Sequence, residues 1–426
     1  MIVGSVASID ANAASFALAG PDAIVGRPLQ ATIDLSAITE NVRAVKHLVG
    51  PRCKVMAVVK ADGYGLGAQW VAAAALEGGA SWLAVACVDE GVQLRRAGYT
   101  GLLLVMSYVP PEEATVAVAN RLTLVLHSSR TGHALELAAQ RLGLGGASVP
   151  VHVKVDTGLG RFGCMPSELM PLLAELSSLP SLRIEGLMTH FADADAEDSG
   201  FAQGQLRLFN ELRATAQAAG FRFDLVHAAN SSAALTLPES HLDMVRVGIL
   251  LSGHLPAGHL AGRIPLRHAI RLTARLARVF TAPEGYFVGY GRTWRAQSAS
   301  VIGLVPVGYA DGYSRSLSNR GQVLVSGVRC PVVGRVSMDQ TAVDLTQVPN
   351  ASEGDEVVLI GTQGDEEIDA ADIGRWAGTI PYEVLCALSA RVPRTYVRDG
   401  NPTDRCTLLG CDPVVERPRT KKALSR

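Results

Sequence analysis

The chain has 426 residues, of which 48% are hydrophobic and 19% are charged, and its formal net charge is −1. This composition predicts a globular protein with a large core divided into two or more domains, and it excludes a disordered chain. Because 39 basic residues are balanced by 40 acidic ones, neither nucleic acid nor an anionic membrane surface is a favoured partner. The densest apolar runs, such as residues 101–106, are far shorter than the roughly 20 residues that span a bilayer.

The two ends of the chain are expected to lie outside the folded domains. Residues 1–28 are expected to form an N-terminal extension, because their one cation, Arg27, comes too late for a secretory signal. Residues 413–426 are expected to form a basic, solvated tail. The seven cysteines include no Cys-x-x-Cys pair and are odd in number, which indicates reduced thiols rather than a disulfide framework or a zinc site. We therefore expect a cytoplasmic protein without a bound metal.

Between residues 29 and 268, short β-rich runs alternate with amphipathic helical stretches. The predicted strands are Ala31–Leu35, Lys54–Lys60, Trp82–Ala86, Gly101–Met106, Leu122–His127, Val151–Asp156, Arg183–His190, Leu225–Ala229 and Met244–Ile249. Helix-forming residues fill the intervening segments, for example 69–77 and 205–219. About eight strand–helix units in about 240 residues predict a closed parallel (β/α)8 barrel of the TIM type rather than an open sheet.

From residue 269 to residue 412 the pattern changes to consecutive strands separated by Gly and Pro. The predicted strands are Ile270–Phe280, Tyr286–Gly289, Ser300–Val307, Gln322–Ser326, Cys330–Ser337, Ala342–Leu345 and Glu356–Ile360. Strands that follow one another without crossover helices usually pair in antiparallel fashion. The predicted fold is therefore α/β, with an N-terminal (β/α)8 barrel followed by a mostly antiparallel C-terminal β domain.

Polar side chains follow several of the predicted barrel strands. They are Lys60, Lys154, Asp156, His190, His227, Asn230 and Arg246. Because the active site of such a barrel lies at the carboxyl ends of its strands, these residues are expected to meet at one mouth of the barrel. Phosphate groups commonly bind there after the last strands, which indicates the Asn230-Ser231 and Gly248-Ile249 segments.

Nine short motifs, in order, resemble the alanine racemase family over nearly the whole chain. They are Val58–Gly65, Lys154–Arg161, Thr189–Phe191, His227–Ser231, Val245–Ile249, Val288–Gly291, Gly308–Gly312, Gly334–Asp339 and Pro381–Val384. The resemblance implies a homodimeric enzyme with pyridoxal 5'-phosphate (PLP) as cofactor and a small amino acid as substrate. It also implies that each active site is shared between the two chains.

The resemblance implies a two-base mechanism with Lys60 and Tyr290 on opposite faces of the substrate. Lys60 would hold PLP covalently and then serve as one base. An amine attacks an aldehyde only when it is neutral, and a barrel mouth can lower a lysine pKa by desolvation. Tyr290 would be the opposing base, with His190 as its hydrogen-bonding partner.

Further residues are implied to bind the cofactor and the substrate. Arg246 would face the pyridine nitrogen without giving up a proton, and His227 would support it. The residues implied to contact PLP are Lys60, Tyr64, His190, Asn230, Ser231, Arg246, Gly248, Ile249 and Tyr382. Ser231 is also a candidate helix N-cap.

The substrate carboxylate is implied to bind Arg161 and the backbone N–H of Met338. In the family, the lysine matching Lys154 is often a carbamate, an anion that could hold Arg161 by charge-assisted hydrogen bonds. Tyr309 and Asp339 belong to two of the matching motifs and are expected to support the site.

Several alternatives remain open beside an alanine racemase that supplies D-alanine for peptidoglycan. The string Gly158–Gly163 matches the G-x-G-x-x-G fingerprint of dinucleotide sites, although Arg161 puts bulk and charge within it. A broader racemase that also takes serine is a second alternative. A related amino-acid decarboxylase and a non-catalytic PLP carrier are the others, and the second domain argues against the carrier.

Overall fold

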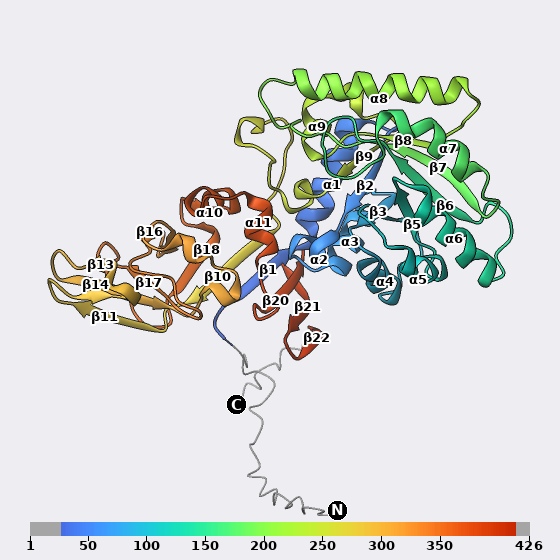
Figure 1. Cartoon of the computed structure of the whole chain (residues 1–426). Helices are drawn as coiled ribbons and strands as arrows, with labels where there is room; N and C mark the ends of the chain where they lie inside the picture. Colours follow the sequence, from blue (N-terminus) through green and yellow to red (C-terminus); the bar gives the residue numbers. More distant parts are fainter. Residues whose placement is uncertain (1–26, 415–426) are drawn as a thin grey trace, which may run out of the picture.

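The structure is a computed structural model that describes residues 27–414. It consists of a barrel surrounded by helices and, beside it, an elongated β domain (Figure 1). The predicted N-terminal extension and basic tail lie outside the described residues, except for residues 27–28 and 413–414. No helix within the described range is long and apolar enough to cross a membrane.

Eight parallel strands form the barrel, as predicted. They are β2 (Lys54–Val58), β3 (Trp82–Val85), β4 (Leu103–Val105), β5 (Thr123–Leu126), β6 (Val149–Lys154), β7 (Leu182–Met188), β8 (Leu225–His227) and β9 (Met244–Val247). Their order in the sheet is β8-β7-β6-β5-β4-β3-β2-β9. Backbone hydrogen bonds close the ring between β8 and β9, from Asp243 N to Val226 O (3.1 Å) and from Arg246 N to Ala229 O (3.0 Å).

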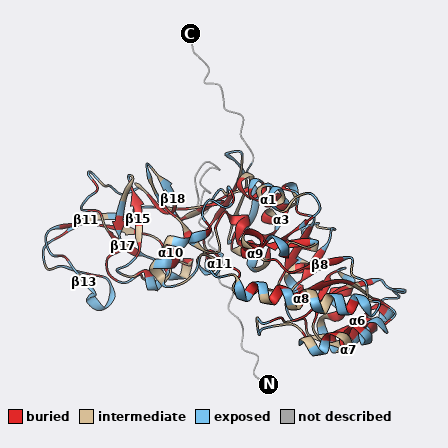
Figure 2. Ribbon diagram, turned by 90° about the horizontal axis from the view of Figure 1, so that it is seen from above, coloured by how far each residue is buried: buried red, intermediate tan, exposed pale blue. Residues whose placement is uncertain are grey.

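Helices cover the outside of the barrel. They are α1 (Leu35–Val49), α3 (Ala68–Glu77), α4 (Val88–Arg96), α5 (Ala114–Ala119), α6 (Ser129–Arg141), α7 (Leu169–Ser177), α8 (Gly200–Ala218) and α9 (Ser231–Thr236). In α1, the Asp34 carboxylate accepts a hydrogen bond from Ala37 N at 3.0 Å and caps the helix. Ile38, Val42 and Val45 form its buried face, because residues three or four apart share one side of a helix. Figure 2 shows the same division along α6 and α8, with buried inner and exposed outer faces.

The second domain is built from antiparallel sheets. Its strands are β10 (Ile270–Arg275), β11 (Arg278–Ala282), β12 (Phe287–Val288), β13 (Trp294–Arg295), β14 (Ser300–Val305), β15 (Gln322–Val325), β16 (Val328–Pro331), β17 (Thr341–Asp344), β18 (Glu356–Gln363), β19 (Glu366–Ile368), β20 (Arg394–Arg398), β21 (Asn401–Thr407) and β22 (Gly410–Pro413). Two helices, α10 (Ala370–Ala377) and α11 (Pro381–Cys386), lie between β19 and β20. The predicted fold class is confirmed.

One predicted strand has a different place from the one expected. The run at 31–35 forms β1 (Gln30–Asp34), which is not a barrel strand. It pairs antiparallel with β10 and parallel with β20, so the assignment of this strand to the barrel is wrong. A strand's sequence reports that it is extended and half-buried but not which strand it will pair with. This pairing joins the two parts of the molecule beside the barrel.

Candidate active site

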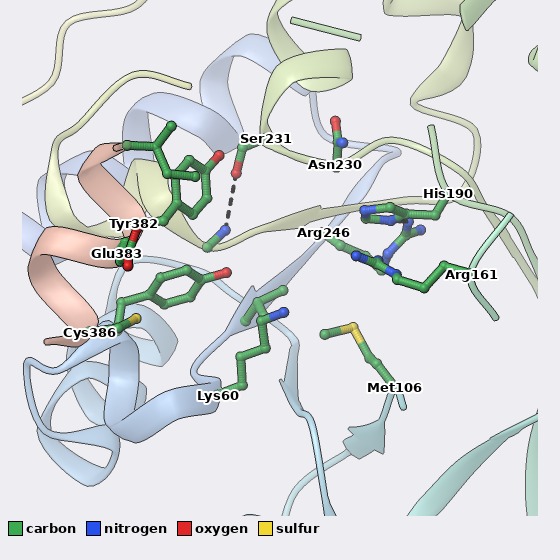
Figure 3. A pocket seen from close by; sticks show the side chains of 14 residues that line it. Lys60, Met106, Arg161, His190, Asn230, Ser231, Arg246, Tyr382, Glu383 and Cys386 are labelled. Atoms are coloured by element: carbon green, nitrogen blue, oxygen red, sulfur yellow. Dashed lines mark hydrogen bonds between the residues drawn. The ribbon is translucent and has the colours of Figure 1, made fainter. Parts of the chain in front are cut away.

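A cavity of about 470 Å³ opens at the mouth of the barrel, where the strands end (Figure 3). Its lining residues are Val58, Lys60, Tyr64, Met106, Arg161, His190, Asn230, Ser231, Arg246, Gly248, Ile380, Tyr382, Glu383 and Cys386. They come from barrel strands β2 and β9, from the segments that follow these and other barrel strands, and from α11 of the second domain with the residue before it. The polar strand-end residues that the sequence indicated therefore meet in one place, as a parallel barrel requires.

Lys60 follows the end of β2 with one residue, Val59, between them, and begins a turn of unusual backbone shape, α2 (Lys60–Tyr64). Ala61, Asp62 and Tyr64 have φ angles of 52°, 54° and 58°, a left-handed conformation that non-glycine residues rarely adopt. The turn brings the side chain of Tyr64 to the same cavity that Lys60 lines. Strain of this kind persists only where the surroundings hold the backbone in place, and it is common at functional sites.

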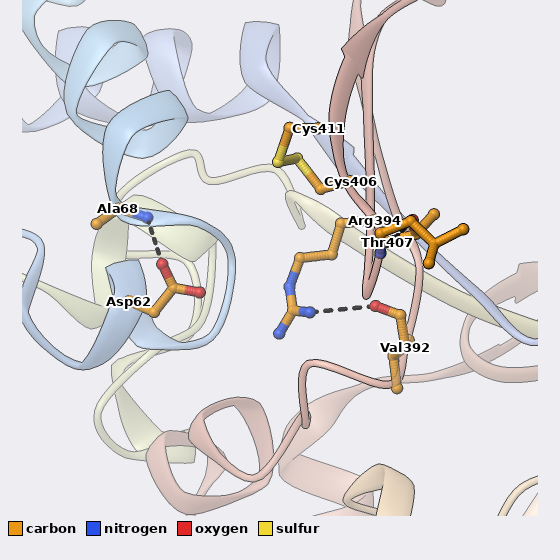
Figure 4. The surroundings of a disulfide bond; sticks show 8 residues. Asp62, Ala68, Val392, Arg394, Cys406, Thr407 and Cys411 are labelled. Atoms are coloured by element: carbon orange, nitrogen blue, oxygen red, sulfur yellow. Dashed lines mark hydrogen bonds between the residues drawn. A yellow bond between two sulfur atoms is a disulfide. The ribbon is translucent and has the colours of Figure 1, made fainter. Parts of the chain in front are cut away.

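Hydrogen bonds with other segments hold this turn, and the one between Asp62 and Ala68 is drawn in Figure 4. The Asp62 carboxylate accepts from Ala68 N at 2.9 Å, and the Glu90 carboxylate accepts from Ala61 N at 2.7 Å. Arg394, from β20 of the second domain, donates to Gly65 O at 2.9 Å. Gly65 itself has φ of 78°, and a Cβ there would lie 2.2 Å from Leu385 O. Both parts of the molecule thus position Lys60.

The environment of Lys60 favours its neutral form. Burial, and then the positive charge of Arg161, lower the pKa of the Lys60 amine. Both effects penalise the ammonium form. Lys60 therefore points into the cavity as an amine whose nucleophilic form is more accessible than that of a lysine on the surface.

Arg246, from β9, is fully enclosed and makes four hydrogen bonds. It donates to His227 Nδ1 (3.0 Å), to His190 Nδ1 (2.8 Å) and to the carbonyl oxygens of Thr189 (3.0 Å) and Ala228 (2.9 Å). Burial lowers the pKa of Arg246 to about 9, so the guanidinium still carries its charge near neutral pH. Because arginine only donates, the Nδ1 atoms of both imidazoles accept, and their Nε2 atoms carry the protons.

The imidazole of His190 is also held by Arg246, and it is neutral. Burial, followed by the positive charge of Arg246, holds the pKa of His190 well below its usual value. With Nδ1 accepting from Arg246, the protonated Nε2 remains available to donate at the cavity.

Lys154 and Arg161 place two further basic groups near this side of the cavity. Lys154 is 5% exposed, and its Nζ lies 5.3 Å from the centroid of the Phe162 ring. Burial, and then the charges of Arg246 and Arg161, lower the pKa of Lys154 to about 7. The neutral form of Lys154 is therefore accessible near neutral pH, and this reduces the repulsion between these cations.

The opposite side of the cavity is formed by hydroxyl and backbone groups. Ser231 Oγ accepts from Gly248 N at 3.1 Å (Figure 3). Asn230 Oδ1 accepts from Ala233 N at 2.9 Å, so Asn230, not Ser231, is the N-cap of α9 and the N-cap expectation for Ser231 is wrong. The rings of Tyr64 and Tyr382 lie 6.0 Å apart.

Four residues expected at the site lie elsewhere in this chain. Tyr290 is 74% exposed, Met338 52% and Tyr309 43%, and these three are not among the residues that line the cavity. Asp339 accepts a hydrogen bond from Arg391 at 2.6 Å. Ile249, also expected at the site, is fully buried and is not among the residues that line the cavity.

In the G-x-G-x-x-G string at Gly158–Gly163, the first four backbone N–H groups are already bonded to a carboxylate of the same chain. The Asp156 carboxylate accepts from the N–H groups of Gly158 (2.8 Å), Leu159 (2.9 Å), Gly160 (3.2 Å) and Arg161 (3.1 Å). An anion-binding turn of this kind is thus already filled by the chain's own carboxylate. The turn instead directs Arg161 to the cavity, and the dinucleotide alternative is not supported.

The cysteines correct one prediction. Cys406 and Cys411 face each other across the β21–β22 hairpin and form a disulfide, with Cα atoms 4.0 Å apart (Figure 4). The expectation of reduced thiols is therefore wrong for this pair. Spacing along the chain did not reveal that a tight turn makes these two residues direct neighbours. The other five cysteines are free, and one of them, Cys386, lines the cavity.

Some lining residues were not identified from the sequence. Met106 follows β4, and its position at a strand end was the available signal. Ile380, Glu383 and Cys386 come from α11 and the residue before it. Only the family resemblance, through Tyr382, linked this helix to the site. Periodicity along the chain could not, because the contact depends on how the second domain folds back.

Fold and cavity together define an enzyme of the barrel-plus-β-domain class with its active site at the barrel mouth. The family models "Alanine racemase, N-terminal domain" and "Alanine racemase, C-terminal domain" match residues 33–256 and 269–396. This chain belongs to the alanine racemase family and is thus an isomerase, as the sequence motifs predicted.

Individual relatives agree with this assignment. The alanine racemase of Desulfovibrio desulfuricans is 44% identical over 371 residues, which cover 87% of this chain and 98% of that protein. The alanine racemase of Symbiobacterium thermophilum is 45% identical over 370 residues, covering 87% and 97%. The crystal structure of the Bacillus anthracis alanine racemase with bound L-Ala-P has a TM-score of 0.85 at 35% identity, covering 91% and 99%.

Proposed function

We propose that this racemase interconverts L- and D-alanine with PLP as its cofactor, by a two-base mechanism, and supplies D-alanine for peptidoglycan in the cytoplasm. The observation that carries the proposal is the meeting of Lys60 and Arg246 in one cavity. Lys60 is an amine with a lowered pKa, and Arg246 is a fixed donor that retains its proton. A covalent attachment point and a donor for a ring nitrogen are what PLP requires.

The residues of the cavity fit the cofactor. A volume of about 470 Å³ lies within the range of small-molecule sites. The hydroxyls of Tyr64, Tyr382 and Ser231, with the backbone at Gly248, provide polar groups on the side opposite Arg246. A Cβ at Gly248 would lie 2.2 Å from the Tyr64 hydroxyl oxygen, so only glycine lets this hydroxyl lie against the backbone, where both would face a phosphate. When bound, PLP withdraws electrons from the substrate Cα and makes its proton acidic.

Lys60 removes or returns the Cα proton on one face of the substrate. Its neutral form accepts the proton, and the lowered pKa keeps that form accessible. Arg246 donates a hydrogen bond and keeps its own proton. Because Arg246 would not give its proton to the ring nitrogen, PLP would withdraw electrons less strongly. This favours return of the removed proton to the substrate Cα.

The base on the other face is Tyr290 of the partner subunit. Tyr290 is exposed and does not reach the cavity of its own chain, so a second copy must bring it there. His190 would receive it, since its Nε2–H is free to donate to the phenol oxygen. Met338 and Tyr309, which are exposed like Tyr290, would approach the same mouth in a two-fold homodimer.

Arg161 binds the substrate carboxylate, together with the backbone N–H of the partner's Met338. The Asp156 turn fixes the backbone at Arg161, which places the Arg161 side chain at the cavity. Lys154, with a pKa of about 7, has enough neutral amine to add CO2. The resulting carbamate would be an anion able to orient Arg161.

Racemisation assays test the proposal. The purified protein is incubated with L-alanine, L-serine and larger L-amino acids, with and without added PLP, and the D-isomer is measured by chiral chromatography. We expect PLP-dependent racemisation with alanine fastest, because Tyr64 and Tyr382 narrow the cavity. Faster turnover of serine would favour the broader racemase. CO2 release without racemisation would favour the decarboxylase, and PLP binding without either reaction the non-catalytic carrier.

A further inference from the structure

A continuous chain of buried side chains connects Arg246 with the interior of the barrel. His227 lies 3.0 Å from Arg246, and its other ring nitrogen lies 2.8 Å from His152 Nδ1. His152 Nε2 lies 3.3 Å from Glu185 Oε2. Both imidazoles are fully buried, and the Glu185 side chain is 11% exposed. The chain therefore runs from the cavity, through two enclosed histidines, to a carboxylate.

The ring nitrogen that carries the proton in His227 and in His152 follows from the two ends of this hydrogen-bonded row, Arg246 and Glu185. Arg246 has no acceptor atom, so His227 Nδ1 accepts and His227 Nε2 carries the proton. His227 Nε2 then donates to His152 Nδ1, which leaves the second proton on His152 Nε2. That proton is donated to Glu185, a carboxylate that only accepts when ionised. Burial lowers the pKa of both histidines, which agrees with two neutral rings.

The far end of the chain reaches the surface of the barrel. Arg183 donates to Glu185 Oε1 at 2.6 Å and to Asp224 at 2.6 Å. The side chains of Arg183 and Asp224 are 41% and 70% exposed. Burial acts to raise the pKa of Glu185, but the hydrogen bonds from His152 and from the Arg183 guanidinium outweigh it and lower this pKa below its usual value, so the carboxylate is ionised near neutral pH.

The barrel is shaped locally to hold this chain. Between β6 and β7, Ile184 pairs with Val151 but Gly186 pairs with His152, so Glu185 is an extra residue in the strand. A bulge of this kind redirects a side chain. A Cβ on Gly186 would lie 2.6 Å from His152 Cγ, so the imidazole occupies space that only glycine leaves free.

The hydrogen-bonded row also connects Arg246 with a negative charge, that of Glu185. The charged side chains that act on the neighbouring His190 are Arg246 itself, Lys154, Arg161 and Lys60, and all of them are basic residues. An enclosed guanidinium without a counter-ion is costly. The two imidazoles each donate toward Glu185 and are polarised by its charge. Polarisation transmits part of the stabilising effect of this carboxylate to Arg246, although Glu185 itself does not line the cavity.

We propose that His152 and Glu185 are positioning residues, which fix the tautomer of His227 and thereby the orientation and charge of Arg246. The catalytic consequence rests on the proposed function, whereas the tautomers do not. Without His152 and Glu185, His227 could carry its proton on Nδ1. An N–H group of His227 would then face an N–H group of Arg246. Arg246 would turn from its place, and the proton transfers that depend on it would slow.

The tautomers are tested by ¹⁵N NMR of the holoenzyme labelled at histidine. We expect His152 and His227 to be neutral Nε2–H tautomers in the wild type. In His152→Phe the proton on His227 Nε2 loses its acceptor, so the ¹⁵N shifts of His227 should change. Wild-type rings protonated on Nδ1, or His227 shifts that stay the same in His152→Phe, would overturn the proposal.

Kinetics then separate positioning from a loss of folding. We expect kcat for alanine to fall about tenfold in His152→Phe, equivalent to about 1.4 kcal/mol of transition-state stabilisation, with KM nearly unchanged because Arg161 is untouched. Glu185→Gln can still accept from His152 but has no charge, so a smaller fall in kcat is expected. Gly186→Ala should crowd His152 and lower kcat with every polar atom still present.

The matched control is Glu175→Gln. Glu175 also binds a histidine, His133, at 2.9 Å, but this pair is exposed and not connected to Arg246. It should leave both kcat and the shifts of His227 unchanged. Wild-type kcat in Glu185→Gln and His152→Phe would overturn the positioning role. A wild-type protein that does not racemise would instead refute the proposed function, while its NMR spectrum would still report on the tautomers.

Discussion

Lys60 and Tyr290 do not share a cavity within one chain. Lys60 lines the mouth of the barrel, whereas Tyr290 is 74% exposed in the β domain. The strand that follows Tyr290, β13, lies at the far end of that domain from β2 (Figure 1). If both residues act on one substrate, the site must be completed by a second copy.

Subunit exchange tests this shared site. Lys60→Ala and Tyr290→Phe should each be inactive, since loss of a general base costs a factor of about 10²–10⁴. In a mixed dimer, one composite site carries both defects and the other carries none. Random exchange makes roughly half the dimers mixed, so activity should recover to about a quarter of wild type. Absence of recovery, after exchange is verified by mass spectrometry, would refute the shared site.

Borohydride reduction should attach the cofactor permanently to Lys60. Lys60 enters the cavity with a lowered pKa, so it should hold PLP before substrate arrives. Peptide mapping after reduction should find the adduct on the Val58–Tyr64 segment. Lys154, a second buried lysine with a lowered pKa, is the internal comparison, and an adduct there would show that the assignment to Lys60 is wrong.

Gly248→Ala should weaken cofactor binding while the fold is retained. The new Cβ would lie 2.2 Å from the Tyr64 hydroxyl oxygen, so Tyr64 must move into the space proposed for the phosphate. We expect the Kd for PLP, measured by absorbance titration, to rise about tenfold, or about 1.4 kcal/mol. Gly145→Ala is the control, because a Cβ there meets no atom within 4 Å. Equal Kd values for the two variants would contradict the phosphate placement.

Carbamylation of Lys154 should depend on pH. CO2 adds to the neutral amine, and the pKa of Lys154 is lowered to about 7. The carbamate should therefore form more readily as the pH rises through 7 and be lost as it falls below 7. With ¹³C-bicarbonate, NMR should show a carbamate signal that is absent in Lys154→Gln. A signal that persists in this variant would place the modification elsewhere.

Much of the fold could be predicted because its signals are local. Apolar runs of strand length, separated by helical stretches, predicted the barrel, and consecutive strands predicted the β domain. The same periodicity could not show that β1 belongs to the second domain. Its residues are those of an ordinary strand, and its pairing partners lie more than 200 residues away in the chain.

The sequence by itself determined that Lys60, His190 and Arg246 would meet, because parallel strands bring their carboxyl ends to one mouth. Only the tertiary structure decided which buried side chains support these three residues. The link from Glu185 through His152 depends on a bulge and on the empty space at Gly186, and the Cys406–Cys411 disulfide depends on a hairpin turn. The separation of Tyr290 from Lys60 depends on how the domains are arranged. Contacts of this kind arise from packing between distant segments, which local periodicity does not encode.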